Sequence, residues 1–162
     1  MSFLDIDERF IEIADLVDIV YSPLVDIKEF PEGVDVALVE GAVSSEDDQR
    51  KIELIRERTR ILVSLGDCAV TANVPAMRNR FKVKDLLARA YVENVSAPGE
   101  PTPLSADEIP ALHPLAKPVH EVVRVDIYVP GCPPPADIIY FVLTELLEGR
   151  VPDLTGKTRF GI

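Results

Sequence analysis

Residues 61–79 read I-L-V-S-L-G-D-C-A-V-T-A-N-V-P-A-M-R-N, an apolar run that ends in glycine and delivers a cysteine to a polar turn. The aliphatic and β-branched residues of this run predict a buried strand with Cys68 at its tip. The other cysteine has an equivalent setting, because residues 122–135 read V-V-R-V-D-I-Y-V-P-G-C-P-P-P. We therefore expect a second strand over residues 122–129, with Cys132 at its tip.

Strand-like and helical segments alternate through the rest of the chain. Ser44 or Ser45 is placed to cap a helix whose first turn is acidic and whose end is basic, as the helix dipole favours. The remaining segments are predicted as helices over residues 1–16, 83–92 and 136–148, strands over residues 17–21 and 34–39, and a long proline-rich loop over residues 94–120. A loop of that length inside a domain is typical of a segment that contacts a partner.

Apolar strands that alternate with helices predict an α/β fold in which helices cover both faces of a parallel sheet. Right-handed crossovers place every strand-to-helix turn at one edge of such a sheet, and ligands bind there. Three turns should meet at this edge: Glu40-Gly41, Cys68 and Cys132. The sequence therefore predicts one binding site built from three turns.

Composition limits the classes of function. With 162 residues, the chain suits a single domain over residues 1–162. A net charge of -11 and a pI near 4.6 argue against binding to nucleic acid or anionic lipid and favour proteins as partners. No apolar run reaches the roughly 18 residues that span a bilayer, and the first residues lack the order of a signal peptide, so we expect a cytoplasmic protein.

The two thiols favour a metal site. Thiolates suit zinc or iron-sulfur clusters, and a cluster takes about four of them. Gly131 allows a close approach of the backbone to a bulky ligand, and the three prolines after Cys132 stiffen the turn. Two alternatives remain open: buried cysteines that act as small apolar residues, and a disulfide switch between Cys68 and Cys132.

Other kinds of site have little support in the sequence. The glycines form no dinucleotide fingerprint and no P-loop, and no nucleophile elbow or Ser-His-Asp arrangement occurs. His113 and His120 lie in or beside the proline-rich loop, where histidines more often face solvent than bind metal. A basic patch of Arg78, Arg80 and Lys82, with Arg60 earlier in the chain, either binds carboxylates of a partner or balances surface charge.

The two cysteine turns, G-D-C-A-V-T-A-N-V-P-A-M-R-N and V-P-G-C-P-P-P-A-D, resemble the small subunit of [NiFe] hydrogenases. The similarity is to the short cytoplasmic type found in bidirectional, NAD-coupled enzymes. It extends over nearly the whole chain through S-F-L-D-I-D-E-R, Y-S-P-L-V-D-I-K, V-E-G-A-V-S-S-E and H-E-V-V. More distantly, the chain resembles the cluster-bearing small subunit of respiratory complex I.

The resemblance implies a flavodoxin-like domain that holds one proximal [4Fe-4S] cluster and relays electrons. The partners would be a large subunit with the NiFe centre and the iron-sulfur and flavin subunits of a diaphorase. Cys68 and Cys132 match the third and fourth cluster ligands. Glu40 corresponds to a turn that lies close to the cluster in the family. Glu40, Gly41, Gly131 and Pro133 are expected only to support the ligands from nearby turns.

The chain departs from the family pattern at its start. Relatives carry a C-x-x-C pair immediately before S-F-L-D, so we expect the first strand and two further ligands upstream of Met1. Ala72 stands where relatives usually have glycine. A second hypothesis is a cluster-free structural or assembly partner of a hydrogenase-like large subunit, which would bind through residues 96–118.

Overall fold

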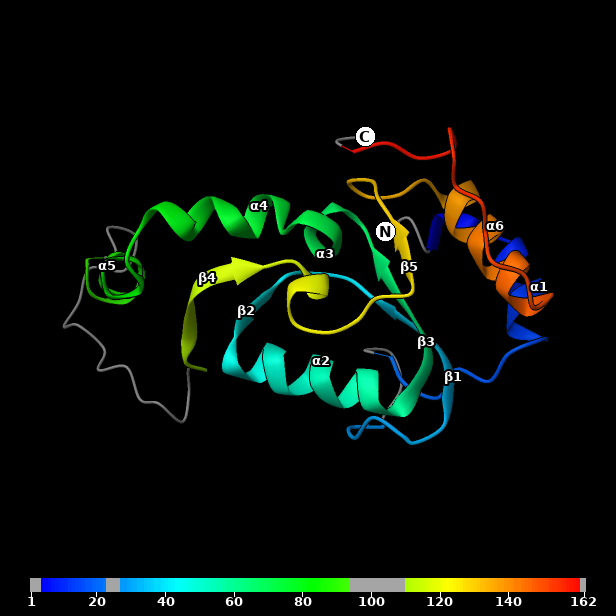
Figure 1. Ribbon diagram of the computed structural model, residues 1–162, viewed down its shortest axis with the longest axis horizontal. Helices are drawn as coiled ribbons and strands as arrows, with labels where there is room; N and C mark the ends of the chain where they lie inside the picture. Colours follow the sequence, from blue (N-terminus) through cyan, green and yellow to red (C-terminus); the bar gives the residue numbers. More distant parts are fainter. Residues whose placement is uncertain (1–3, 23–26, 94–109, 161–162) are drawn as a thin grey trace.

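The computed structural model describes residues 4–22, 27–93 and 110–160 (Figure 1). Its helices and strands are those of an α/β protein, although one predicted strand is absent from the described residues and two short strands were not predicted. The elements are η1 (Leu4–Ile6), α1 (Arg9–Ala14), β1 (Val34–Val39), β2 (Val43–Ser45), α2 (Glu46–Arg58), β3 (Thr59–Leu65), α3 (Asp67–Thr71), α4 (Asn73–Ala76), η2 (Met77–Arg80), α5 (Val83–Leu87), the π-helical turn η3 (Ala88–Val92), β4 (Leu112–Lys117), η4 (Val119–Glu121), β5 (Ile127–Val129) and α6 (Ala136–Leu147).

The central sheet is parallel and has the strand order β1-β3-β5. Val39 at the end of β1 lies opposite Ser64 of β3, and Leu65 at the end of β3 lies opposite Val129 of β5. The carboxyl ends of all three strands therefore lie at one edge of the sheet. The predicted parallel α/β fold is confirmed.

Helices cover both faces of this sheet (Figure 1). On one face, Ile52 of α2 belongs to a core cluster with Ala37 and Leu62. On the other face, Val142 of α6 forms a second cluster with Val63. Because alternate residues of a strand point to opposite faces, successive residues of β3 supply both clusters.

The start of α2 follows the predicted capping pattern. The Ser45 hydroxyl accepts a hydrogen bond from the Asp48 amide, and the Asp48 carboxylate accepts from the Ser45 amide. Burial opposes ionisation of Asp48, but hydrogen bonds from Ser44 and Ser45 outweigh it and lower the pKa of this carboxyl below its usual value. This reciprocal pair is a capping box that satisfies donors left open at a helix N-terminus.

The predicted strand over residues 17–21 is wrong. These residues form no strand, and Ile19 and Val20 are exposed. A strand is stabilised by hydrogen bonds to a neighbouring strand, and in the described residues β1 is the edge of its sheet with a partner only on the β3 side. The apolar pattern at 17–21 has no neighbour to pair with there.

Further boundaries differ from the prediction. The helix predicted over residues 1–16 is divided at Asp7, where φ is +56°, into η1 and α1. The end of the predicted loop is β4, which pairs antiparallel with β2 in a second, two-stranded sheet. The prediction missed this strand because it contains Pro114. Proline normally argues against a strand, since it lacks the N-H that pairs with a neighbouring strand. The strand predicted over 122–129 shortens to β5, since Val122 and Val123 are bound into the turn of η4. Residues 94–109 of the predicted loop lie outside the described residues.

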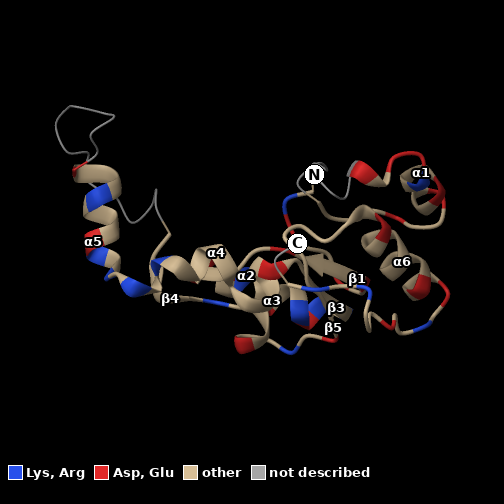
Figure 2. Cartoon of the chain, turned by 90° about the horizontal axis from the view of Figure 1, so that it is seen from above, with Lys and Arg blue, Asp and Glu red and all other residues tan. Residues whose placement is uncertain are grey.

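A segment that we call the arm, residues 73–92, extends away from the central sheet. Figures 1 and 2 both show α5 at the far end of the molecule from α6, with α4 leading out to it. The arm begins directly after α3, the short helix that contains Cys68. Within the described ranges, no helix of the arm or of the body has the length and hydropathy needed to cross a bilayer.

Candidate functional site

The two cysteine turns lie side by side at the carboxyl edge of the sheet. The β3–β5 pairing continues past the ends of both strands, because the Gly66 amide donates to the Val129 carbonyl at 2.7 Å and the Asp67 amide donates to the Gly131 carbonyl at 2.8 Å. The residues immediately before Cys68 and Cys132 are therefore bonded to each other. The structure thus brings these two turns together at one edge of the sheet, as the sequence predicts.

The Asp67 side chain makes a second connection between the turns. Asp67 is 3% exposed, and its Oδ1 accepts a hydrogen bond from the Gly131 amide at 2.7 Å. An acceptor in this position satisfies a buried N-H that would otherwise be costly. The prediction from sequence missed Asp67; the available signal was an acidic residue placed between the last glycine of a buried strand and a cysteine.

Gly131 is required by the shape of its own turn. Its φ is +145°, and a Cβ at this position would lie 2.5 Å from the Cα of Pro134. The sequence predicted that Gly131 lets the backbone approach a bulky ligand closely. In the structure, the close approach is between Gly131 and Pro134 of the same turn. Pro133, which follows Cys132 through a cis peptide bond, is exposed.

Both cysteines are free thiols. Cys68 is half-buried near the start of α3, and Cys132 is exposed in the turn before α6. The Asn73 amide nitrogen, on the first residue of α4, donates to Cys132 Sγ at 3.8 Å. Asn73 was not selected from the sequence, and it joins the segment after the first thiol to the second thiol.

Glu40 and Gly41 follow the end of β1 at the same sheet edge. Both residues are exposed, and Gly41 has a φ of +86°. Among the described residues, no hydrogen bond joins Glu40 to Cys68 or Cys132. The third predicted turn therefore shares the edge with the thiols without bonding to either of them.

The histidines do not extend the thiol site. His113 lies within β4, where its carbonyl accepts from Arg78, and the exposed His120 packs edge-on against Tyr128 with ring centroids 5.9 Å apart. In the described part of the chain, no group of three or more Cys, His, Asp or Glu side chains is placed to hold a metal ion. The donors present fit iron-sulfur ligation in kind, since they are thiols on a rigid edge, but supply only two of about four ligands.

The predicted basic patch divides into parts with different roles. Arg60 forms an ion pair with Asp35 of β1. Arg78 is half-buried and its Nη2 donates to the carbonyls of Ser44 and His113, at 3.0 and 2.9 Å. Arg78 therefore fastens the arm to β2 and β4, and it is not free to bind a partner.

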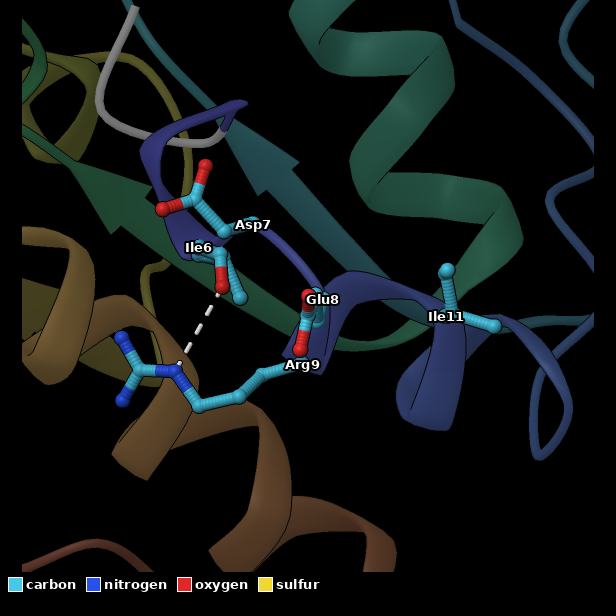
Figure 3. Close-up of a pocket in the computed structure, with 5 residues that line it drawn as sticks. All are labelled: Ile6, Asp7, Glu8, Arg9 and Ile11. Atoms are coloured by element: carbon cyan, nitrogen blue, oxygen red, sulfur yellow. Dashed lines mark hydrogen bonds between the residues drawn. The ribbon is translucent and has the colours of Figure 1, made fainter.

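An open depression beside α1 is lined by no cysteine (Figure 3). In Figure 3 the Arg9 side chain extends towards α6, where it forms an ion pair with Asp137 at 2.8 Å and lies over the Tyr140 ring. These contacts bind α1 to α6. The depression is lined by Ile6, Asp7, Glu8, Arg9 and Ile11.

A parallel α/β sheet with paired turns at its carboxyl edge defines the class of flavodoxin-like domains that bind a ligand at that edge. The family model described as NADH ubiquinone oxidoreductase, 20 Kd subunit, matches residues 1–146. The delta subunit of the NAD-reducing hydrogenase HoxS from Cupriavidus necator is 46% identical over 157 residues, which are 95% of this chain and 75% of that subunit.

Two further relatives agree with this match. A subunit of the F420-non-reducing hydrogenase vhu from Methanocaldococcus jannaschii is 36% identical over 97% of this chain, which spans only 54% of that longer protein. A chain in the crystal structure of an NAD+-reducing [NiFe]-hydrogenase in the H2-reduced state has a TM-score of 0.91 at 41% identity, covering 99% of this chain and 90% of that chain.

The chain therefore belongs to the family of the 20 Kd subunit of NADH ubiquinone oxidoreductase, and it is homologous to a subunit of an NAD-reducing hydrogenase. The resemblance to hydrogenase small subunits that the cysteine turns carry is confirmed.

Proposed function

We propose that this chain is the electron-transfer small subunit of a cytoplasmic, NAD-coupled [NiFe] hydrogenase. Cys68 and Cys132 would be two ligands of one [4Fe-4S] cluster, with two further ligands from outside the 162 residues. Its partners would be the large subunit, which carries the NiFe site, and the iron-sulfur and flavin subunits of a diaphorase. The observation that carries the proposal is the direct bonding of the two cysteine turns through Asp67 and Gly131.

The chain's own residues would act by holding the thiols in place. The strand ends of β3 and β5 fix the two turns, and the buried Asp67 carboxylate ties them together. The Asn73 amide donates to the Cys132 sulfur, which stabilises negative charge there. A bound cluster would supply reversible one-electron transfer between the large subunit and the diaphorase.

The experiment is to express the chain together with its upstream codons and its large subunit, and to measure iron, acid-labile sulfide and the EPR spectrum after reduction. We expect about four irons per chain, and we expect Cys68→Ser or Cys132→Ser to abolish the signal. Lys51→Ala, on the exposed surface of α2, is the control that should retain it. A complex that contains no cluster would contradict the electron-transfer role.

A second candidate is a cluster-free structural or assembly partner of a hydrogenase-like large subunit. It is favoured by the described residues themselves, which hold two free thiols and no group of three or more metal-binding side chains. The nucleotides upstream of Met1 discriminate the two, because an in-frame C-x-x-C supports the cluster and a stop codon supports the cluster-free partner.

A further inference from the structure

A pocket on the two-stranded sheet is lined by neither cysteine. Its volume is about 210 Å³. Figure 1 shows β2 and β4, which form this sheet, next to α2. The residues that line the pocket come from separate segments of the chain and include Val43 of β2, Gln49 of α2, His113, Leu115 and Lys117 of β4, and Val122 after η4. The pocket therefore exists only because the fold brings these segments together.

The walls of this pocket are partly aliphatic. Val43 is buried, Val122 is half-buried, and Leu115 is exposed. His113, Leu115 and Lys117 are alternate residues of β4, so their side chains share one face of the strand. An aliphatic side chain thus lies between an imidazole and an ammonium group along the pocket wall.

The polar side chains of the pocket can donate hydrogen bonds. The Lys117 ammonium group forms no ion pair among the described residues, and His113 Nε2 is buried there without a hydrogen-bond partner. Gln49 Nε2 donates to Glu53 Oε1 at 2.8 Å, which leaves its second N-H open. A buried polar atom without a partner is costly. The pocket therefore favours a ligand that brings acceptor oxygens.

The charges beside the pocket favour an anionic ligand. Asp48 of α2 is engaged in the capping box, and Glu53 is engaged by Gln49. The Arg78 guanidinium is held by backbone carbonyls of β2 and β4 and forms no ion pair within the described residues. Other surface lysines also lack ion pairs, but Lys117 borders a pocket that has a second cation close by. The local charge is therefore positive in a chain of net charge -11.

We infer that this pocket binds a small carboxylate with a short aliphatic body. The carboxylate oxygens accept hydrogen bonds from Lys117 and His113, and the aliphatic part contacts Val43, Leu115 and Val122. A volume of about 210 Å³ holds about seven water molecules at roughly 30 Å³ each, so the ligand has about that many non-hydrogen atoms. Isovalerate has this size and shape. The inference is independent of the proposed function.

The test is a titration of the isotope-labelled chain with isovalerate, followed by the NMR chemical shifts of the backbone amides. We expect saturable shifts around the pocket, at Gln49 and Leu115 among others, with a Kd of about 1 mM or lower, as suits so few atoms. Isovaleramide has the same shape without the charge and should bind about tenfold more weakly. Shifts that do not saturate, shifts confined to other parts of the chain, or equal binding of the amide would overturn the inference.

A matched pair of variants tests the charged end of the pocket. Lys117→Met removes the charge and keeps an unbranched apolar stem, and it should raise the Kd for isovalerate about tenfold. Lys51→Met makes the same change on the exposed surface of α2 and should leave the Kd unchanged. Equal affinity of the Lys117 variant and the unaltered chain would overturn the carboxylate site.

A second pair tests the aliphatic wall. The unaltered chain should bind isovalerate about tenfold more tightly than acetate, because isovalerate buries more apolar surface. Leu115→Ser should reduce this preference to about threefold or less, whereas Val151→Ser, at another exposed apolar residue, should preserve it. A preference that Leu115→Ser leaves intact would overturn the aliphatic part of the site. Circular dichroism melting curves of all variants show whether each one is folded.

Discussion

Asp67 and Gly131 exchange two hydrogen bonds although 64 positions separate them in the chain. One bond joins backbone to backbone, and the other joins the Gly131 amide to the Asp67 carboxylate. Each residue directly precedes a cysteine. A buried side chain, together with backbone hydrogen bonds, thus links the two thiol turns.

Replacement of Asp67 should show the importance of this contact. Asp67→Ala leaves the buried Gly131 amide without its acceptor, and we expect a loss of about 1–3 kcal/mol in the free energy of unfolding. Asp67→Asn retains an acceptor oxygen and should recover most of this loss. Urea unfolding followed by circular dichroism measures both variants, and equal stability of the alanine variant and the unaltered chain would contradict the role of Asp67.

Gly131 should not tolerate a side chain. Gly131→Ala places a Cβ 2.5 Å from Pro134 Cα at a φ of +145°, and we expect a destabilisation of about 2 kcal/mol or more. The matched control is Gly149→Ala, where φ is +73° and no atom lies within 4 Å, so only the backbone cost of about 1 kcal/mol applies. Thermal unfolding of both variants gives the comparison. A similar cost at the two sites would show that the Gly131 turn relaxes freely.

Asn73 should raise the reduction potential of a cluster bound through Cys132. A hydrogen bond to a ligand sulfur stabilises the more negative, reduced state. Asn73→Ala should therefore lower the potential by a few tens of millivolts, equivalent to about 1 kcal/mol. Redox titration monitored by EPR measures the shift. Asn79→Ala removes an amide that binds Ala116 and no thiol, so it should leave the potential unchanged.

The cap of α2 provides a test of local stability. Ser45→Ala removes the acceptor of the Asp48 amide, and we expect a loss of about 1 kcal/mol in the free energy of unfolding. Ser45→Asn, another good capping residue, should restore most of it. Guanidinium unfolding curves measure the difference, and identical midpoints for all three proteins would exclude a role for the cap in stability.

Asp126 should contribute stability that depends on pH. Burial opposes its ionisation, but the Leu62 amide and the Arg56 guanidinium outweigh burial and hold the pKa of Asp126 below its usual 3.8. Because the folded pKa is the lower one, the stabilisation is present above the unfolded pKa and is lost as pH falls through the folded pKa. Asp126→Asn should cost about 1 kcal/mol at pH 7, and this difference should shrink below roughly pH 4.

Urea unfolding at pH 7, 5 and 3 measures the difference in the free energy of unfolding between the Asp126→Asn variant and the unaltered chain. The control is Asp35→Asn, whose exposed pair with Arg60 should contribute little at any of these pH values. A difference between the Asp126 variant and the unaltered chain that stays constant down to pH 3 would contradict the assignment.

Local patterns were sufficient to predict the elements that carry the thiols. Strands β1 and β3 read as apolar, β-branched runs, and Ser44 or Ser45 before an acidic turn read as a helix cap. Both signals are local: a strand is recognised from the alternation of its side chains, and a helix cap from the residues of the first turn that follows it. The parallel sheet and the common edge of Cys68 and Cys132 follow from these elements by general rules of chain crossover.

The features that the sequence did not predict depend on contacts between segments that are distant in the chain. Residues 17–21 have the composition of a strand, but no described strand pairs with them. Strand β4 exists despite Pro114 because β2 lies beside it. Asp67 is buried where its carboxylate accepts from the Gly131 amide, and Arg78 is held against the body by the carbonyls of Ser44 and His113.

The sequence by itself thus determined which residues form strand tips with thiols and which family the chain resembles. Only the tertiary structure decided that hydrogen bonds between Asp67 and Gly131 join those tips and that Arg78 and Asn79 fasten the arm to the body. The physical reason is that hydrogen bonds between segments far apart in the chain have no local signature, whereas periodicity and capping do.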